Sequence, residues 1–395
     1  MLSQKIGIQR LVSFLVFALS LCNNYVMGQG VISSDQEKFY LYSEILKENR
    51  EIIINLPDDY NSSKKHYPIL LILDAEGERR FNLSITGYVY YSGVRRLPKM
   101  IIAGIPNTNR KRDLSPYKIK QREFSGGGEK FLNFISEELI PYLNSNYRTA
   151  EYKILFGASS AGTFSLYALY SSPNSFNAVI ASRSALNSTT EITWKNEIIF
   201  EKMNDFLNSN KCFGKSLYID YGGQEDAFHE PGAIHRLNNL ITNSTQRNFR
   251  KEFRKIGESG YRSAESLLNG LLWIFNDWYY PADSLYINGF KGIDNHSNKL
   301  IAIYDYYVKI TDLLSENELN MFGYQFLERN NIEDAIRLLD YSVKTFPDSW
   351  ESHESLAEVY LKIGQKDLAL QHLTKSLQIN PDNTSAKELL KILNM

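Results

Sequence analysis

The chain has 395 residues, of which 43% are hydrophobic and 23% are charged, values typical of a soluble globular protein with more than one domain. Its net charge of −1 at pH 7 gives no electrostatic reason to expect nucleic acid or an anionic membrane surface as a partner. Short basic clusters such as Arg110–Arg112 are interpreted as solvated loop faces. The sequence contains no H-E-x-x-H motif, no C-x-x-C pair and no phosphate-binding glycine loop, so it predicts no metal and no cofactor.

Residues 1–28 have the pattern of a secretory signal peptide, with two basic residues ahead of the apolar run Leu11–Leu21 and a cleavage point after Gly28. The apolar run is too short to cross a bilayer comfortably, so the mature chain is expected to have no membrane span. We therefore expect an exported protein, periplasmic or secreted. Lipid attachment at Cys22 is the less favoured alternative, because Leu21 is large for the position before a lipidated cysteine.

Residues 29–280 alternate between strand-like and helical patterns. Strands are expected at Glu51–Leu56, Tyr67–Asp74, Met100–Ile105, Lys153–Phe156, Ala178–Ala181, Ser216–Tyr221 and Phe249–Ile256, and helices at Phe131–Tyr147, Ala161–Tyr170, Ala233–Thr242 and Ala264–Trp278. The continuous apolar runs suit strands buried on both faces of a parallel sheet. Strands alternating with helices predict a doubly wound α/β domain, in which reactive residues lie at the carboxyl ends of the strands.

The string Gly157-Ala158-Ser159-Ser160-Ala161-Gly162 joins one of these strands to the helix that follows it. It is close to the G-x-S-x-G nucleophile elbow, a strained strand-to-helix turn that exposes a serine hydroxyl. Small residues are needed there because the turn is tight and the helix packs closely on the strand. The fifth position is alanine here, with glycine next. On this string alone, an ordinary Ser/Gly loop is an equal alternative.

Several short strings, in a fixed order, carry a resemblance to a known family. They are Arg50, Leu56–Tyr60, Tyr67-Pro68, Leu73-Asp74, Asn107–Pro116, Ser125–Gly127, Glu138–Tyr142, Tyr147–Thr149, the elbow, Ser172-Pro173 and Phe176. With them, the segment from about Ser43 to Asp277 resembles the putative-esterase family of α/β-hydrolases, which includes siderophore esterases, esterase D and several carbohydrate esterases. The resemblance implies an α/β-hydrolase fold and hydrolysis of a small-molecule ester, of carbohydrate or siderophore type, through an acyl-serine.

The resemblance also implies the roles of individual residues. Ser159 matches the family nucleophile. The backbone N–H of Ser160 and a second N–H, from Ala75 or Glu76, would form the oxyanion hole.

The resemblance places the acid of the triad after the strand Ser216–Tyr221. There Glu225 is the expected residue and Asp226 the reserve, with a solvated loop carboxylate as the alternative. The family histidine should lie about a dozen residues before a Gly-Leu pair, and this chain has Ser259 at that position. Serine cannot act as a general base near neutral pH. Three interpretations stay open: a catalytically inactive scaffold that binds a ligand or partner, a substitute histidine (His229, which is nearer than His235), or weak catalysis by the elbow and oxyanion hole alone.

Residues 281–316 are interpreted as a connector with one helix at Leu300–Leu314, and residues 317–395 as a helical repeat region. The pairs Leu327/Leu361, Ala335/Ala369 and Pro347/Pro381 are each 34 residues apart, which is the period of the tetratricopeptide repeat. Asn330 stands where the second copy has Gly364, and asparagine also tolerates a left-handed turn. Leu300–Leu314 and Ser385–Leu393 are expected to flank the pair, and the array to dock on the hydrolase domain. A protein or peptide partner for the repeats and a purely stabilising role are equal alternatives.

Overall fold

The computed structural model describes residues 36–76, 78–93, 96–118, 124–186, 193–222, 232–244, 248–257, 263–278, 295, 298–299 and 314–393. The predicted signal peptide (residues 1–28) lies outside these ranges, as does the predicted connector helix up to residue 313. In the described ranges, no helix combines the length and apolar composition needed to cross a membrane.

The described strands form one eight-stranded sheet in the order β1-β2-β4-β3-β5-β6-β7-β8. Their bounds are β1 Gln36–Ser43, β2 Glu48–Asn55, β3 Tyr67–Leu73, β4 Ile101–Ile105, β5 Thr149–Ala158, β6 Ala178–Ser182, β7 Ser216–Tyr221 and β8 Arg250–Lys255. The strands from β4 to β8 pair in parallel, which confirms the predicted parallel sheet. β1 and β2 pair in antiparallel fashion, so the interpretation of Glu51–Leu56 as a parallel strand is wrong.

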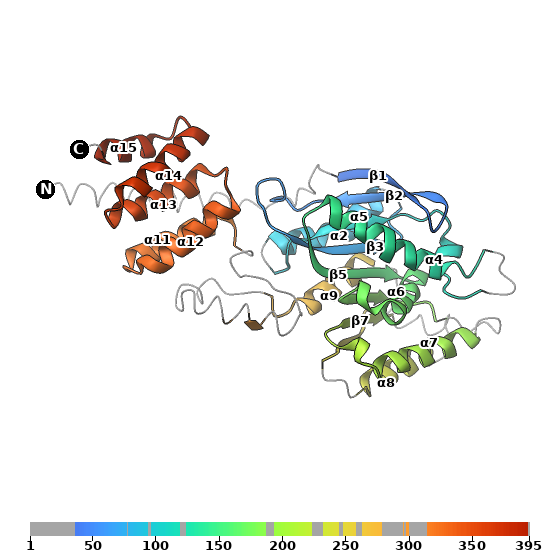
Figure 1. Cartoon of the computed structure of the whole chain (residues 1–395). Coiled ribbons are helices and arrows are strands. Elements are labelled where there is room, and N and C mark those ends of the chain that lie inside the picture. Colours follow the sequence, from blue (N-terminus) through green and yellow to red (C-terminus); the bar gives the residue numbers. More distant parts are fainter. Residues whose placement is uncertain are drawn as a thin grey trace.

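Helices cover both faces of the sheet, as expected for a doubly wound domain (Figure 1). On one face α2 (Glu78–Gly93) and α9 (Ser263–Ile274) pack over an apolar cluster. The helices that pack on the other face or lie among its connections are α3 Arg110–Asp113, α4 Gly128–Asn133, η1 Phe134–Leu139, α5 Ile140–Asn146, α6 Ser160–Ser171, η2 Pro173–Ser175, α7 Thr193–Leu207, η3 Asn210–Cys212 and α8 Ala233–Thr242. The predicted helix Phe131–Tyr147 is present as α4, η1 and α5. Its wide π turn precedes Pro141, which cannot donate a helical hydrogen bond.

Three elements differ from the expectation, each for a physical reason. β1 lies at the sheet edge and exposes half of its residues, so it lacks the apolar run of a central strand. α2 was not expected, because it has Gly87 in its interior and glycine disfavours a helix. The glycine allows close packing instead, since an added Cβ would lie 2.9 Å from Leu268 of α9. Arg110–Arg112 lie in the short helix α3, and two of their guanidinium groups bind carboxylates, so the interpretation as a loop is wrong, whereas Arg110 and Lys111 are exposed as expected.

A buried ion network joins β2 to α3. Arg50 is fully buried, and its Nη1 lies 2.6 Å from Oδ2 of the equally buried Asp113. Arg112 binds the other oxygen of Asp113 at 2.6 Å and also bridges to Glu48, and its hydrogen bond holds the pKa of Glu48 below the usual value. The Arg50 guanidinium lies 5.0 Å from the centre of the Phe131 ring. Arg50, Arg112 and Asp113, which all belong to the strings of the family resemblance, are therefore in contact with one another.

The C-terminal region consists of antiparallel helix pairs, as the period predicts. The helices are α11 Glu316–Glu328, α12 Ile332–Thr345, α13 Trp350–Lys362, α14 Lys366–Ile379 and α15 Thr384–Leu393. The turn residues Asn330 and Gly364 have φ values of 62° and 76°, so the predicted equivalence of these two positions is confirmed. α15 packs on α14, as expected for a flanking helix.

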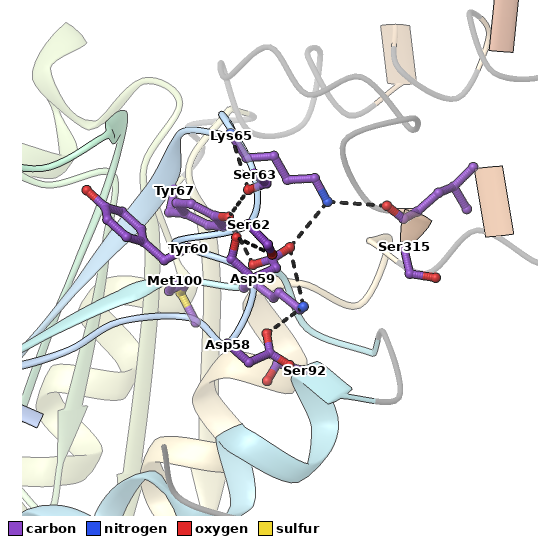
Figure 2. Close-up of polar contacts among 12 residues, drawn as sticks. Asp58, Asp59, Tyr60, Ser62, Ser63, Lys65, Tyr67, Ser92, Met100 and Ser315 are labelled. Atoms are coloured by element: carbon purple, nitrogen blue, oxygen red, sulfur yellow. Dashed lines mark hydrogen bonds and ion pairs between the residues drawn. The ribbon is translucent and has the colours of Figure 1, made fainter. Parts of the chain in front are cut away.

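The repeats contact the α/β domain at the loop that precedes β3. The backbone N–H of Lys64 donates to the Thr345 carbonyl at 3.2 Å. The Lys65 Nζ donates to the Leu314 carbonyl at 3.2 Å, and the same ammonium group lies 3.4 Å from Oδ2 of Asp59 (Figure 2). Burial alone would raise the pKa of Asp59, but the charges of Lys65 and Lys99 keep it below its usual value. The predicted docking of the repeats is confirmed.

Lys65→Met is expected to loosen this contact. The change removes a charge-assisted hydrogen bond and leaves Asp59 with one fewer cation, at a cost of about 1–3 kcal/mol. Amide hydrogen exchange at Phe346, whose ring lies 5.3 Å from the Lys65 Nζ, should become roughly 10-fold faster or more. Lys64→Met is the matched control, because only the backbone of Lys64 makes the contact. Equal exchange in both variants would contradict a role for the Lys65 ammonium group.

Candidate functional site

Ser159 lies alone between the last residue of β5 and the first residue of α6. Its backbone angles are φ 59° and ψ −123°, a conformation that non-glycine residues rarely adopt and that costs about 1–3 kcal/mol. The residue is half-buried, and its hydroxyl makes no hydrogen bond with the described part of the chain. The predicted strand-to-helix elbow is confirmed, and the ordinary-loop alternative is wrong, because a strained serine at this junction is the defining feature of the elbow.

Two glycines make this elbow sterically possible. A Cβ added to Gly157 would lie 2.3 Å from the Ala161 carbonyl oxygen, and one added to Gly162 would lie 2.6 Å from the Ser182 carbonyl oxygen. Both neighbours are backbone atoms that cannot move aside. Ala161 itself is fully buried, so a methyl group is tolerated at the fifth position. The close approach to β6 occurs one residue later than the G-x-S-x-G pattern suggests.

The backbone of Ser159 is hydrogen-bonded to the end of β6 and to the segment that follows it. Its N–H donates to the Ser182 carbonyl at 2.9 Å, and its carbonyl accepts from Ala185 at 3.2 Å and from Thr163 at 3.1 Å. These bonds hold the strained residue in place from both sides, since Thr163 lies on its own helix, Ser182 ends β6 and Ala185 lies on the connection that follows β6.

The predicted oxyanion-hole residues lie at the ends of adjacent strands. Ser160 opens α6, so its N–H has no acceptor within the helix and lies at the positive end of the helix dipole. Ala75 follows β3, which pairs with β5, but its N–H makes a long 3.4 Å hydrogen bond to the Ile105 carbonyl. Glu76 is the next residue, and its side chain accepts a hydrogen bond from Asn107. The oxyanion-hole assignment stays a prediction.

A charged cluster that sequence reasoning did not identify as a site lies next to these residues. Asp74 has a φ of 54°, and its carboxylate accepts from Arg110 Nη2 at 2.7 Å and from Asn107 Nδ2 at 2.6 Å. Asn107 also binds Glu76. The residues follow β3 and β4, which pair with each other, so the cluster lies at the carboxyl edge of the sheet. Asp74, Asn107 and Arg110 all belong to the strings of the family resemblance, which was the available signal.

Two buried polar residues on the other side of Ser159 were also missed. Asp220 of β7 is fully buried, and its Oδ1 accepts from the Ser182 hydroxyl at 2.8 Å. Burial raises the pKa of Asp220 above the usual value. Arg183, the first residue after β6, is only 4% exposed. A single acid in an apolar strand and a single arginine after one give no sequence pattern, so neither could have been identified in advance.

The remaining predicted site residues are not placed by the structure. Glu225, Asp226, His229 and Ser259 lie outside the described residues, so the acid and the base stay predictions. His235 is described: it lies on α8 with its ring exposed and 6.1 Å from the ring of Tyr221.

Comparison with known proteins identifies the family to which the chain belongs. The sequence model of the putative esterase family matches residues 43–265, which is more than half of the chain and includes the Ser159 elbow. The chain belongs to the putative esterase family. A tetratricopeptide-repeat model matches residues 326–393, in agreement with the helix pairs of the C-terminal region.

Other members and neighbours of the putative esterase family share parts of the chain. A siderophore enterobactin esterase of Emericella nidulans is 31% identical over 113 residues, which are 26% of this chain and 34% of that relative, so the match spans about a third of the relative's length. An IroE-like serine hydrolase from Shewanella oneidensis has a TM-score of 0.64 at 23% identity and covers 78% of this chain and 99% of its own. The siderophore hydrolase EstB from Aspergillus nidulans has a TM-score of 0.51 at 21% identity, over 63% and 97% of the two chains. These structures confirm the α/β-hydrolase fold.

Proposed function

We propose that this protein is an exported serine esterase that cleaves a carboxylic ester through an acyl-Ser159 intermediate. The observation that carries the proposal is the strained backbone of Ser159 between β5 and α6. A residue held at φ 59° and ψ −123° by hydrogen bonds on both sides stores strain that a purely structural serine has no need for.

In the proposed reaction the Ser159 hydroxyl attacks the ester carbonyl and gives its proton to a general base. The new bond joins Ser159 Oγ to the acyl carbon, and the bond from that carbon to the alcohol oxygen breaks. The protonated base gives the proton to the leaving alcohol. The negative charge on the carbonyl oxygen is stabilised by the Ser160 N–H and by a second N–H from Ala75 or Glu76. Water then releases the acid and restores the free serine.

The general base must come from another residue than the one at the family position, since the chain has Ser259 where the family pattern has histidine. His229 is our candidate for the base, and Glu225, with Asp226 as the reserve, is the candidate for the acid that orients it. Relatives named for siderophore and enterobactin esters support a siderophore-type substrate, with carbohydrate esters as the second class. The signal-like residues 1–28 support export, and the repeats support a protein or peptide partner.

Ser159→Ala is expected to abolish covalent labelling by a fluorophosphonate probe and to lower the hydrolysis of a short p-nitrophenyl ester by at least about 10³-fold, because it removes the hydroxyl that forms the acyl bond. Intact-mass spectrometry measures the labelling, and absorbance measures the hydrolysis. Ser172→Ala, a half-buried serine just past the other end of α6, is the control and should behave like the wild type.

Two results would contradict the proposal in different ways. Equal labelling of Ser159→Ala and the wild type would place the reactive group elsewhere. A folded wild-type protein that neither labels nor hydrolyses esters would support the alternative, a hydrolase-fold scaffold that uses its pocket and repeats for binding.

A further inference from the structure

One buried cation lies beside the elbow without a role in the reaction described above. Arg183 directly follows β6, is only 4% exposed, and has a φ of 43°. A buried charge and a left-handed backbone each cost free energy, and both costs fall on a single residue. Such local violations of the folding rules are expected where a residue serves a function.

The backbone of this segment connects Ser159 to β7. The Ser182 carbonyl accepts the Ser159 N–H at 2.9 Å, and the next residue, Arg183, donates its own N–H to the Asp220 carbonyl at 2.8 Å. The Ser182 hydroxyl reinforces the link through its bond to Asp220 Oδ1. The elbow, β6 and β7 are therefore held in one hydrogen-bonded unit.

The side chain of Arg183 extends this unit to β8. Its Nη2 donates to the carbonyl of Ile256, the residue after β8, at 3.1 Å. On the way it passes Gly222, the residue after β7, where an added Cβ would lie 2.9 Å from Nη1. The guanidinium thus spans the carboxyl ends of both strands, at a point where glycine makes room for it.

The position of those two strand ends matters for the chemistry. In a doubly wound sheet the residues that act on the nucleophile come from loops at the carboxyl ends of neighbouring strands. β7 and β8 lie two and three strands from β5, at a spacing of about 4.8 Å per strand. A misplacement of about 1 Å between reacting groups can cost roughly 100-fold in rate.

We propose that Arg183 is a positioning residue, whose guanidinium fixes the ends of β7 and β8 relative to the Ser159 elbow and thereby sets the rate at which Ser159 is acylated. This inference rests on the proposed serine-esterase function. It makes Arg183 neither a base nor an oxyanion donor, because the residue acts through the strand ends that it holds.

The test compares Arg183→Met and Arg183→Ala with Arg250→Met. Arg250 is the matched control: it lies at the amino end of β8 and likewise donates to a backbone carbonyl, that of Ile274, at 2.8 Å. Both methionine variants are expected to lose thermal stability, but only Arg183→Met should slow fluorophosphonate labelling, by about 10- to 100-fold. Added guanidinium ion should restore part of the labelling rate of Arg183→Ala.

A second readout does not depend on activity. The Ile256 N–H donates to the Tyr221 carbonyl at 2.8 Å and so joins the two strand ends. Its hydrogen exchange should become at least about 10-fold faster in Arg183→Met and stay unchanged in Arg250→Met. Unchanged exchange in Arg183→Met, or labelling at the wild-type rate, would overturn the inference. If the wild type itself does not label, the proposed function fails, and the proposed effect on acylation fails with it. The exchange result is independent of labelling and decides whether Arg183 holds the strand ends.

Discussion

Asp113→Ala is expected to lower the free energy of unfolding of the α/β domain by about 3 kcal/mol, because it removes the fully buried counter-charge of Arg50 and leaves only the partly exposed Glu48, 3.0 Å away. Arg50 and Asp113 are both fully buried and lie 2.6 Å apart, so water cannot replace the lost carboxylate. Arg112, which binds the other oxygen of the same carboxylate, loses a partner as well. Urea denaturation followed by circular dichroism measures the change.

A more exposed arginine of the same helix provides the control. Arg110 binds Asp74 at 2.7 Å, but its side chain is 43% exposed, so Arg110→Ala should cost no more than about 1 kcal/mol. A loss of less than about 1 kcal/mol in Asp113→Ala would mean that the Arg50 guanidinium reaches solvent after the change, and our description of this network as buried would be wrong.

Gly157→Ala is expected to destroy the elbow. The added Cβ would lie 2.3 Å from the Ala161 carbonyl oxygen and 2.6 Å from the Ser165 hydroxyl, so either α6 moves away from β5 or the protein fails to fold. Overpacking typically costs about 1–3 kcal/mol, and the backbone neighbour, which cannot move aside, places Gly157→Ala at the upper end of this range or above it. In any folded fraction, fluorophosphonate labelling of Ser159 should fall by at least about 100-fold.

Gly93→Ala is the control for this change, because an added Cβ at the exposed end of α2 meets no atom within 4 Å. Labelling and thermal stability of that variant should match the wild type. If Gly157→Ala folds and labels normally, the tight contact between β5 and α6 is not required to present Ser159.

The sequence allowed the elbow and the repeats to be predicted because both are local patterns. Ser159 is marked by the small residues around it, and Asn330 by its distance of 34 residues from Gly364. The strand β8 is expected from its place in the alternation of strands and helices, because its own residues are mostly charged. Its charged residues fit an edge strand, since one side of β8 has no neighbouring strand among the described residues.

The parts that could not be predicted depend on contacts between distant segments. Asp220 has the appearance of an ordinary polar residue in a strand, and its burial becomes visible only when β6 and β7 are paired. Arg183 has no periodic partner, and its contacts lie 39 and 73 residues further along the chain, at Gly222 and Ile256. Arg112 was misinterpreted for the same reason, because its partner Glu48 is 64 residues away.

The place where the repeats dock has a consequence for how the two halves of the protein can work together. Lys64 and Lys65 lie before β3, at the amino end of the parallel strands, whereas Ser159 follows the carboxyl end of β5. The length of β5, about 30 Å, therefore separates the two regions. A molecule bound to the repeats on this side of the sheet would lie at the end opposite Ser159 and would leave the Ser159 elbow uncovered.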